Sequence, residues 1–209
     1  MKYDGIIFDM DGTLWDAVGS YCAVWNETIV RFGIDRDAIT YGELAPLMGR
    51  SLDDIYDTLI GLPQARTAFN KVLMEQEELM MPQLGGKLYN GVAPTLQRLH
   101  NDGAQLFMVS NCSASGLPNF LNYTGLRPLM PDALSLGQNG RDKTHNIMQL
   151  VKDHKLKSPV YVGDTQGDCT SAQAAGIPFV WASYGFGKDV HGAEYVISDI
   201  SELIDLQTS

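Results

Sequence analysis

Short apolar stretches recur along the chain, and turn-forming residues and then a helical pattern follow most of them. These stretches are nearly continuous in apolar residues, which is typical of parallel strands that helices cover on both faces. The alternation predicts an α/β fold with a doubly wound parallel sheet. The expected strands are 5–9, 104–110, 133–136, 159–164, 177–182 and 194–198, and the expected helices are 92–102, 114–123, 142–155 and 168–175.

One long segment interrupts this alternation, because it contains helical patterns and no convincing strand. Its first helix is amphipathic and ends at Gly33, a typical helix C-cap. A stretch with one proline and three glycines at 82–91 then indicates a connector. We therefore expect a core domain of residues 1–16 and 84–209, with an all-helical cap domain of residues 17–83 inserted after the first strand.

Acidic residues stand where the expected strands end. Asp9 ends the first strand, Asp11 follows two residues later, and Asp164 ends a later strand shortly before Asp168. Ligands of open parallel sheets bind beyond the carboxyl ends of the strands. Carboxylates gathered there would repel one another unless a cation neutralised them. Magnesium suits such a place, because it takes one or two carboxylates and contacts substrate phosphate.

Donor groups are expected at the same edge. Ser110 and Asn111 end a second strand, and Lys143 begins a helix. A cation, an ammonium group and hydrogen-bond donors are what a phosphoryl group requires. A rigidly held carboxylate can attack phosphorus and form an aspartyl-phosphate, while a second acid donates and later accepts a proton. Gly12 allows the sharp turn between them.

Four segments carry a resemblance to a known family. "DMDGTL" at 9–14, "SN" at 110–111, Lys143 and "GDTQGD" at 163–168 resemble, in order and spacing, the signature motifs of the haloacid dehalogenase-like hydrolase superfamily. The resemblance covers essentially the whole chain. The helical insert is similar to the cap of the phosphoglycolate phosphatase and β-phosphoglucomutase-like branch. The resemblance implies a Rossmann-like core and an Mg²⁺-dependent phosphatase that forms an aspartyl-phosphate.

The resemblance also implies roles for single residues. Asp9 would be the nucleophile, and Asp11 would be the general acid and base, with a side chain that is not a metal ligand. The phosphoryl group would bind to Ser110, Asn111 and Lys143. The implied magnesium ligands are Asp9, the backbone carbonyl of Met10 and Asp164, with Asp168 as a further ligand or as a support behind them.

Several alternatives stay open. Arg50 lies in a polar loop of the insert, from which a cap can lower a guanidinium onto substrate, but a surface arginine is the simpler interpretation. Asp11 argues against the dehalogenase branch, which does not use this acid. The mutase branch typically has a cap histidine where this chain has Tyr21, and an acid where it has Gly163, so a phosphatase is favoured over a phosphoglucomutase-like enzyme. A non-catalytic binding protein would be expected to have lost its motif aspartates.

Composition restricts the partners and the cellular compartment that we expect for this protein. The net charge is −10 and no basic stripe is present, which argues against nucleic-acid partners. No apolar run reaches the roughly 18 residues that span a membrane, and Asp9 breaks the N-terminal apolar stretch, so we expect neither a membrane anchor nor a signal peptide. Three separated cysteines are typical of free thiols in the cytoplasm. We expect a cytoplasmic enzyme for a small phosphorylated metabolite, whose identity, like the oligomeric state, the sequence leaves open.

Overall fold

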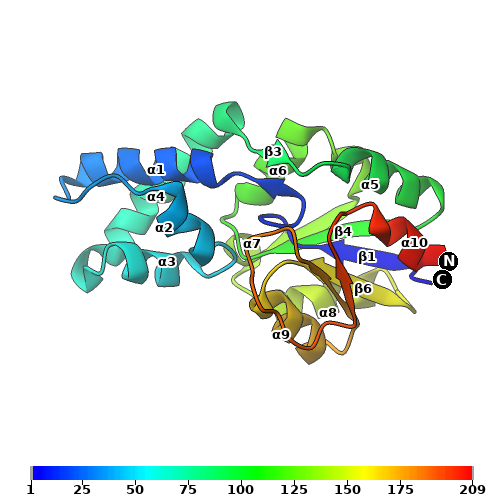
Figure 1. Ribbon diagram of the computed structural model, residues 1–209. Coiled ribbons are helices and arrows are strands. Elements are labelled where there is room, and N and C mark those ends of the chain that lie inside the picture. Colours follow the sequence, from blue (N-terminus) through cyan, green and yellow to red (C-terminus); the bar gives the residue numbers. More distant parts are fainter. Residues whose placement is uncertain (1, 209) are drawn as a thin grey trace.

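A six-stranded parallel sheet forms the centre of the molecule, as the computed structural model of residues 2–208 shows (Figure 1). The strand order is β5-β4-β1-β6-β7-β8, and every neighbouring pair is parallel. The chain adds strands first on one side of β1 and then on the other, which confirms the doubly wound, Rossmann-like sheet. The strands are β1 (Gly5–Phe8), β4 (Gln105–Ser110), β5 (Asp132–Ser135), β6 (Pro159–Gly163), β7 (Phe179–Ala182) and β8 (Tyr195–Ile197).

Helices cover both faces of the sheet (Figure 1). α8 and α9 pack on one face together with Ile7 of β1, whereas Ile6 and Phe8 join the apolar cluster of the other face, where α5 and α6 pack. Burial on both faces explains why β1, β4, β6 and β7 are almost wholly apolar. The helices of this part are α5 (Val92–Asn101), α6 (Gly116–Thr124), η3 (Arg127–Leu129), α7 (Leu136–Asn139), α8 (Lys143–Asp153), α9 (Gln166–Ala174) and α10 (Glu202–Thr208).

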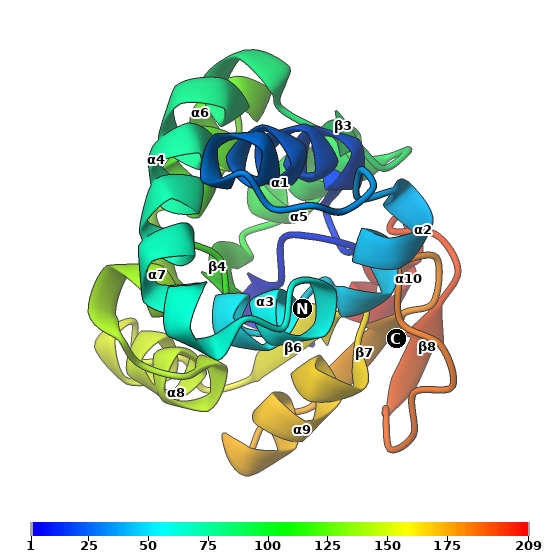
Figure 2. The same ribbon diagram turned by 90° about the vertical axis from the view of Figure 1, so that its left-hand side faces the viewer.

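All regular elements of the insert are helices. Figure 2 views the molecule from the side of the insert and shows these helices in front of the sheet. Gly33 ends the first helix in the left-handed conformation, with φ 64°. Phe69 is fully buried between the rings of Trp25, Phe32 and Tyr56, at centroid distances of 5.5, 5.3 and 5.1 Å. The helices are α1 (Val18–Phe32), α2 (Tyr41–Leu44), η1 (Ala45–Leu47), α3 (Leu52–Leu59), η2 (Pro63–Ala65) and α4 (Arg66–Leu84). Their assignment to a separate cap domain at residues 17–83 stays a prediction.

The segment 82–91, which we expected to be a connector, instead contains the end of α4 and a short strand. Pro82 lies inside the last turn of α4, and the helix ends only at Gly85, whose φ is +57° and where a side chain would overlap the ring of Tyr123. The chain then forms β3 (Lys87–Leu88), which pairs antiparallel with β2 (Trp15–Asp16). The two crossings into and out of the insert therefore lie side by side. Strands of two residues carry no periodicity from which they could be predicted.

Two further expectations can be compared with the structure. Cys22, Cys112 and Cys169 are free thiols, as expected. Among residues 2–208, no helix combines the length and the apolar character that a membrane crossing requires.

Candidate active site

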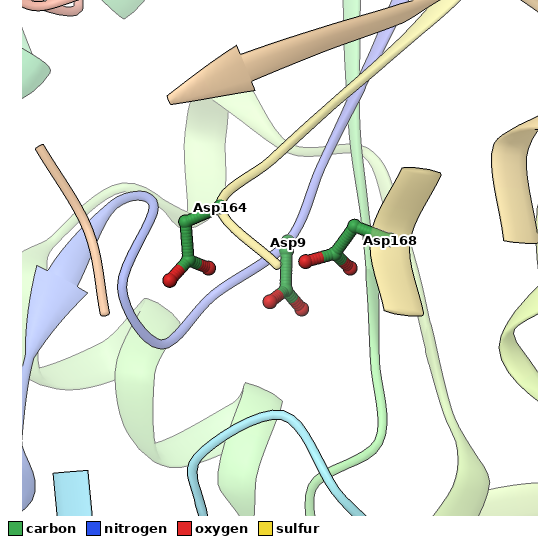
Figure 3. A group of neighbouring side chains, drawn as sticks. All are labelled: Asp9, Asp164 and Asp168. Carbon is green, nitrogen blue, oxygen red and sulfur yellow. The ribbon is translucent and has the colours of Figure 1, made fainter. Parts of the chain in front are cut away.

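Three aspartates meet at the carboxyl edge of the sheet. Asp9 directly follows β1, Asp164 directly follows β6, and Asp168 lies in the first turn of α9. One carboxylate oxygen of each lies within 4.8 Å of one from the others, and Figure 3 shows the three side chains gathered at this edge. All three are at least 98% buried, with exposed fractions of 2%, 0% and 0%. Such a buried group of acids requires compensating positive charge.

Lys143 supplies part of that charge. Its Nζ donates to Asp9 Oδ1 at 2.9 Å and to Asp168 Oδ1 at 2.6 Å. Burial acts to lower the pKa of Lys143, but the carboxylates of Asp168 and Asp9 outweigh it and raise this pKa well above its usual value. The ammonium group is therefore charged, although it stands in the first turn of α8, where the helix dipole disfavours a cation.

Asp168 is fully engaged by the protein. Its Oδ1 accepts from Lys143 and, at 3.3 Å, from the hydroxyl of Tyr161. Its Oδ2 accepts from the backbone N–H and the hydroxyl of Thr165, at 2.9 and 2.6 Å, which caps α9. With both oxygens occupied, Asp168 is better suited to position Lys143 than to bind a metal directly.

Asp9 and Asp164 retain oxygens that suit a cation. Asp9 Oδ2 is buried without any hydrogen-bond partner. Asp164 Oδ2 accepts from the backbone N–H groups of Phe186 and Gly187, at 2.8 and 3.3 Å, while its Oδ1 has only a 3.3 Å contact from the hydroxyl of Thr13. Hard carboxylate oxygens of this kind are the ligands that magnesium prefers.

Burial makes these two carboxylates costly to ionise without a cation. Burial raises the pKa of Asp9 to about 6, which the charge of Lys143 partly offsets and that of Asp168 increases. Burial also raises the pKa of Asp164 to about 8, with additional contributions from Asp168 and Asp9. A bound divalent cation would stabilise both carboxylates, so the residues fit the magnesium site that the resemblance implies.

The Met10 carbonyl does not fit the ligand set that the sequence implied. It accepts backbone hydrogen bonds from Thr13, Leu14 and Trp15, at 3.3, 2.9 and 3.3 Å. A carbonyl oxygen has two lone pairs, and these three donors occupy them. We therefore remove Met10 from the candidate ligands, because its carbonyl closes the turn that carries Asp11. Gly12 makes this turn possible, since its φ is +84° and a side chain there would overlap the Asp164 carboxylate.

Asp11 lies beside this group and is held by Trp15. The indole Nε1 of Trp15 donates to Asp11 Oδ1 at 2.9 Å. Burial, followed by the charge of Asp9, raises the pKa of Asp11 well above its usual value. A protonated Asp11 can donate a proton to a departing oxygen. The sequence holds a signal for one of these roles, because Thr165 and Asp168 have the three-residue spacing of a capping box. The hydrogen bonds of Trp15 and Tyr161 depend on the folded conformation, and none of the three roles was predicted.

The strand-end donors and the insert meet in one pocket. Ser110, which is 4% exposed, ends β4 and lines the pocket together with Asp9 and Asp11. Asn111 Nδ2 donates to the carbonyl of Gly49 at 2.9 Å, which ties the Arg50 loop to the core. Arg50 is exposed and lines the same pocket.

This pocket has a volume of about 320 Å³ and lies between the strand ends and the insert. Apolar side chains of α1, α3 and α4 form much of its wall, and Glu77 of α4 is the one buried acid that the insert adds. Glu77 could not be recognised from the sequence, because it stands in a helix between the exposed residues Glu75 and Glu78. The site thus combines a buried acidic and basic cluster with a mainly apolar compartment.

Comparisons with known proteins agree with this geometry. A phosphoglycolate phosphatase of Vibrio parahaemolyticus is 25% identical, over 96% of this chain and 94% of the relative. Another phosphoglycolate phosphatase, of Synechococcus elongatus, is 29% identical, over 87% of this chain and 84% of the relative. The crystal structure of "a predicted phosphoglycolate phosphatase" from Haemophilus somnus shares the fold, with a TM-score of 0.88, 18% identity and 99% coverage of both chains.

The relatives confirm the predicted enzyme class, a phosphatase, and the predicted branch. The family model described as haloacid dehalogenase-like hydrolase matches residues 6–182, which is most of the sheet and all of the insert. The chain therefore belongs to the haloacid dehalogenase-like hydrolases.

Proposed function

We propose that this protein hydrolyses a small phosphate monoester in two steps, with Asp9 as the nucleophile, Asp11 as the general acid and base, and Mg²⁺ as the cofactor. The observation that carries the proposal is the state of the Asp9 carboxylate. Lys143 holds one of its oxygens, and the other is buried without a partner beside the pocket. A nucleophile needs such a fixed position and a free lone pair.

In the first step, an oxygen of Asp9 attacks the phosphorus atom of the substrate. The bond between phosphorus and the ester oxygen breaks, and Asp11 gives its proton to that oxygen, so that an alcohol leaves. The raised pKa of Asp11 supports this role, because it keeps the acid protonated before the transfer. Ser110 and Lys143 stabilise the charge on the transferred group.

In the second step, water attacks the phosphorus atom of the aspartyl-phosphate. Asp11, now ionised, takes a proton from that water, and the bond between phosphorus and Asp9 breaks to release inorganic phosphate. Both residues return to their starting protonation states. Trp15 keeps Asp11 directed toward the pocket during both transfers through its hydrogen bond.

The magnesium ion would be held by Asp9 and Asp164, with Asp168 and Lys143 positioned behind them. It would neutralise the carboxylates and the oxygens of the phosphoryl group. The Phe186 and Gly187 amides fix Asp164 for this role. Arg50, from its loop above the strand ends, would contact the bound phosphate ester.

The proposal can be tested with 4-nitrophenyl phosphate as the substrate. We expect hydrolysis that requires Mg²⁺, that chelation with EDTA removes and that added Mg²⁺ restores. Asp9→Asn should lower kcat by at least about 10³-fold, because it removes the nucleophile. Asp35→Asn, the same substitution at an exposed position, is the matched control and should have no effect. Activity that persists in Asp9→Asn, or in EDTA, would rule out this mechanism.

A further inference from the structure

We infer that Glu77 selects the leaving group: the pocket accepts the phosphate ester of a mainly apolar alcohol that carries a hydroxyl or ammonium group, and it disfavours a leaving group with a carboxylate. This inference rests on the proposed phosphatase function. It goes beyond that function because it assigns a substrate class and a residue that determines specificity.

The wall of the pocket on the side of the insert is suited to an apolar body. Apolar side chains from all four α-helices of the insert line it, among them Val24, Trp25, Leu44, Leu52, Ile55 and Leu73. A volume of about 320 Å³ lies within the range of sites for small organic ligands, about 300–1,000 Å³. A phosphoryl group together with a two-carbon acid would leave much of this apolar surface without contact.

Glu77 stands at the part of the pocket that the leaving group must occupy. It is 7% exposed, and its Oε1 accepts from the hydroxyl of Ser113 at 2.6 Å. It lines the pocket together with Asp11 and with Tyr21 of α1. Since Asp11 faces the ester oxygen in the proposed reaction, Glu77 flanks the atoms that follow this oxygen.

The balance of charge around the pocket opposes a second anion there. Four acids line it, namely Asp9, Asp11, Asp53 and Glu77, and Arg50 is the one basic residue in the described part of its lining. Arg50 follows Gly49, whose carbonyl accepts a hydrogen bond from Asn111 at the end of β4. We therefore assign the charge of Arg50 to the end of the pocket where the phosphoryl group binds. A carboxylate on the leaving group would meet Glu77 without a nearby cation, and like charges brought together without solvent repel strongly.

A hydroxyl or ammonium donor has the opposite effect. The structure gives Glu77 one hydrogen bond, which leaves Oε2 as an acceptor. Burial raises the pKa of Glu77, which the Ser113 hydrogen bond partly offsets, and a donor from the substrate would stabilise the ionised form further. A charge-assisted hydrogen bond in a secluded pocket strongly favours substrates that supply the donor.

The experiment compares alkyl phosphates of equal chain length, from two to five carbons, that end in a hydroxyl, an ammonium or a carboxylate group. The two-carbon carboxylate is phosphoglycolate. We expect wild-type kcat/KM for the hydroxyl and ammonium esters to exceed that for the matched carboxylate by at least about tenfold. Wild-type protein that hydrolyses the carboxylate esters as well as the other two would overturn the inference without any variant.

Glu77→Gln tests the residue itself, because it removes the charge and keeps the shape. We expect the preference to shrink by at least about tenfold, mainly through a gain for the carboxylate esters. Glu78→Gln, at the exposed neighbouring position of the same helix, is the matched control and should keep the preference. An unchanged preference in Glu77→Gln would contradict the inference.

Glu77 also joins α4 to the loop after β4, so a purely structural role must be separated from selection. Ser113→Ala removes that hydrogen bond and leaves the charge of Glu77 in place. We expect it to keep the preference, whatever its effect on overall rate; a loss equal to that of Glu77→Gln would show that the contact, and not the charge, matters. Hydrolysis of 4-nitrophenyl phosphate reports the proposed function separately, because a failure there removes activity toward every ester, whereas a failure of this inference removes only the preference.

Discussion

The strand-end cluster, which consists of Asp9, Lys143, Asp164 and Asp168, and the pocket wall formed by the insert differ in how their charged groups are paired. In the cluster, Lys143 is bonded to Asp9 and Asp168, and two backbone amides hold Asp164. On the wall, most side chains are apolar, and Glu77 has a single hydrogen bond. Tightly paired groups are fixed in place, whereas a sparsely paired acid is available to a ligand. We therefore expect the cluster to determine which reaction is catalysed and the wall to determine which substrate is accepted.

This comparison predicts two kinds of variant. Changes in the cluster should alter stability and affect every substrate alike, because the same buried pairs hold the reacting groups. Changes on the wall should leave the fold largely intact and redistribute activity among substrates. Variants in the cluster and one at its border with the insert test this division.

Lys143→Met should have the largest effect on stability. It leaves the carboxylates of Asp9 and Asp168 buried without their ammonium partner, and breaking a buried pair in this way costs about 3–5 kcal/mol. We expect that loss in the free energy of unfolding, measured with urea at pH 8 in EDTA, together with loss of hydrolysis of all esters. Lys152→Met, at an exposed position of the same helix, should change stability by less than about 1 kcal/mol. A Lys143→Met protein as stable as wild type would show that the cluster is not held by charge pairing.

Sequence patterns were sufficient for the sheet and for the residues of its edge. Nearly continuous apolar runs marked most of the six strands, because strands buried on both faces admit few polar side chains. The strand ends brought Asp9, Ser110 and Asp164 together, since parallel strands share one carboxyl edge. The helical insert was predicted for a similar reason, because amphipathic spacing indicates helices even when their packing is unknown.

Hydrogen bonds and contacts that depend on the folded conformation could not be predicted in this way. The Met10 carbonyl was assigned to a metal, yet its three backbone donors depend on the conformation of a turn. Trp15 packs edge-on against Phe120 at a centroid distance of 4.9 Å, and its indole N–H also holds Asp11, a role that its apolar ring does not indicate. Glu77 becomes part of the pocket only because α4 packs next to the loop after β4. The spacing of these residues along the chain does not specify the turn or the packing that forms such contacts.

Asp164→Asn should have a smaller effect, and one of opposite sign. The folded-state pKa of Asp164, about 8, lies above its ordinary value of 3.8, so the folded protein binds this proton more tightly than the unfolded chain does. Without a divalent cation, the stabilisation by that proton is complete below pH 4 and is lost as the pH rises to about 8. Asparagine does not titrate, so the variant should lose less stability over this range.

We expect metal-free Asp164→Asn to be more stable than metal-free wild type at pH 8 by at least about 1 kcal/mol, or about 2–4 °C in Tm. Added Mg²⁺ should raise the Tm of the wild type more than that of the variant, because the variant lacks a proposed ligand. Differential scanning fluorimetry between pH 5 and 8, with EDTA or Mg²⁺, measures both. Asp35→Asn again serves as the control, and equal pH slopes for Asp164→Asn and wild type would contradict the prediction.

Asn111 lies where the two regions meet, and its substitution should have the smallest effect. It was predicted to bind the phosphoryl group, but its amide donates to the carbonyl of Gly49 in the insert. If this contact holds the Arg50 loop over the strand ends, Asn111→Ala should loosen the loop without weakening the phosphoryl site. The loss of one hydrogen bond of about 1 kcal/mol corresponds to a decrease in kcat/KM of about fivefold.

Inhibition by inorganic phosphate distinguishes the two roles of Asn111. A phosphoryl ligand contributes to the binding of free phosphate, so its removal should weaken inhibition by the same factor as kcat/KM. A residue that holds the loop should leave inhibition by phosphate within about twofold of wild type, and should increase hydrogen exchange at the amides around Gly49. We expect the second result. Ser113→Ala, which removes the hydrogen bond between the loop after β4 and α4, should increase exchange in α4 instead, because its partner Glu77 lies on that helix. If Asn111→Ala weakened inhibition by phosphate as much as it lowered kcat/KM, Asn111 would be a phosphoryl ligand. It would then belong to the strand-end cluster and not to the contact between core and insert.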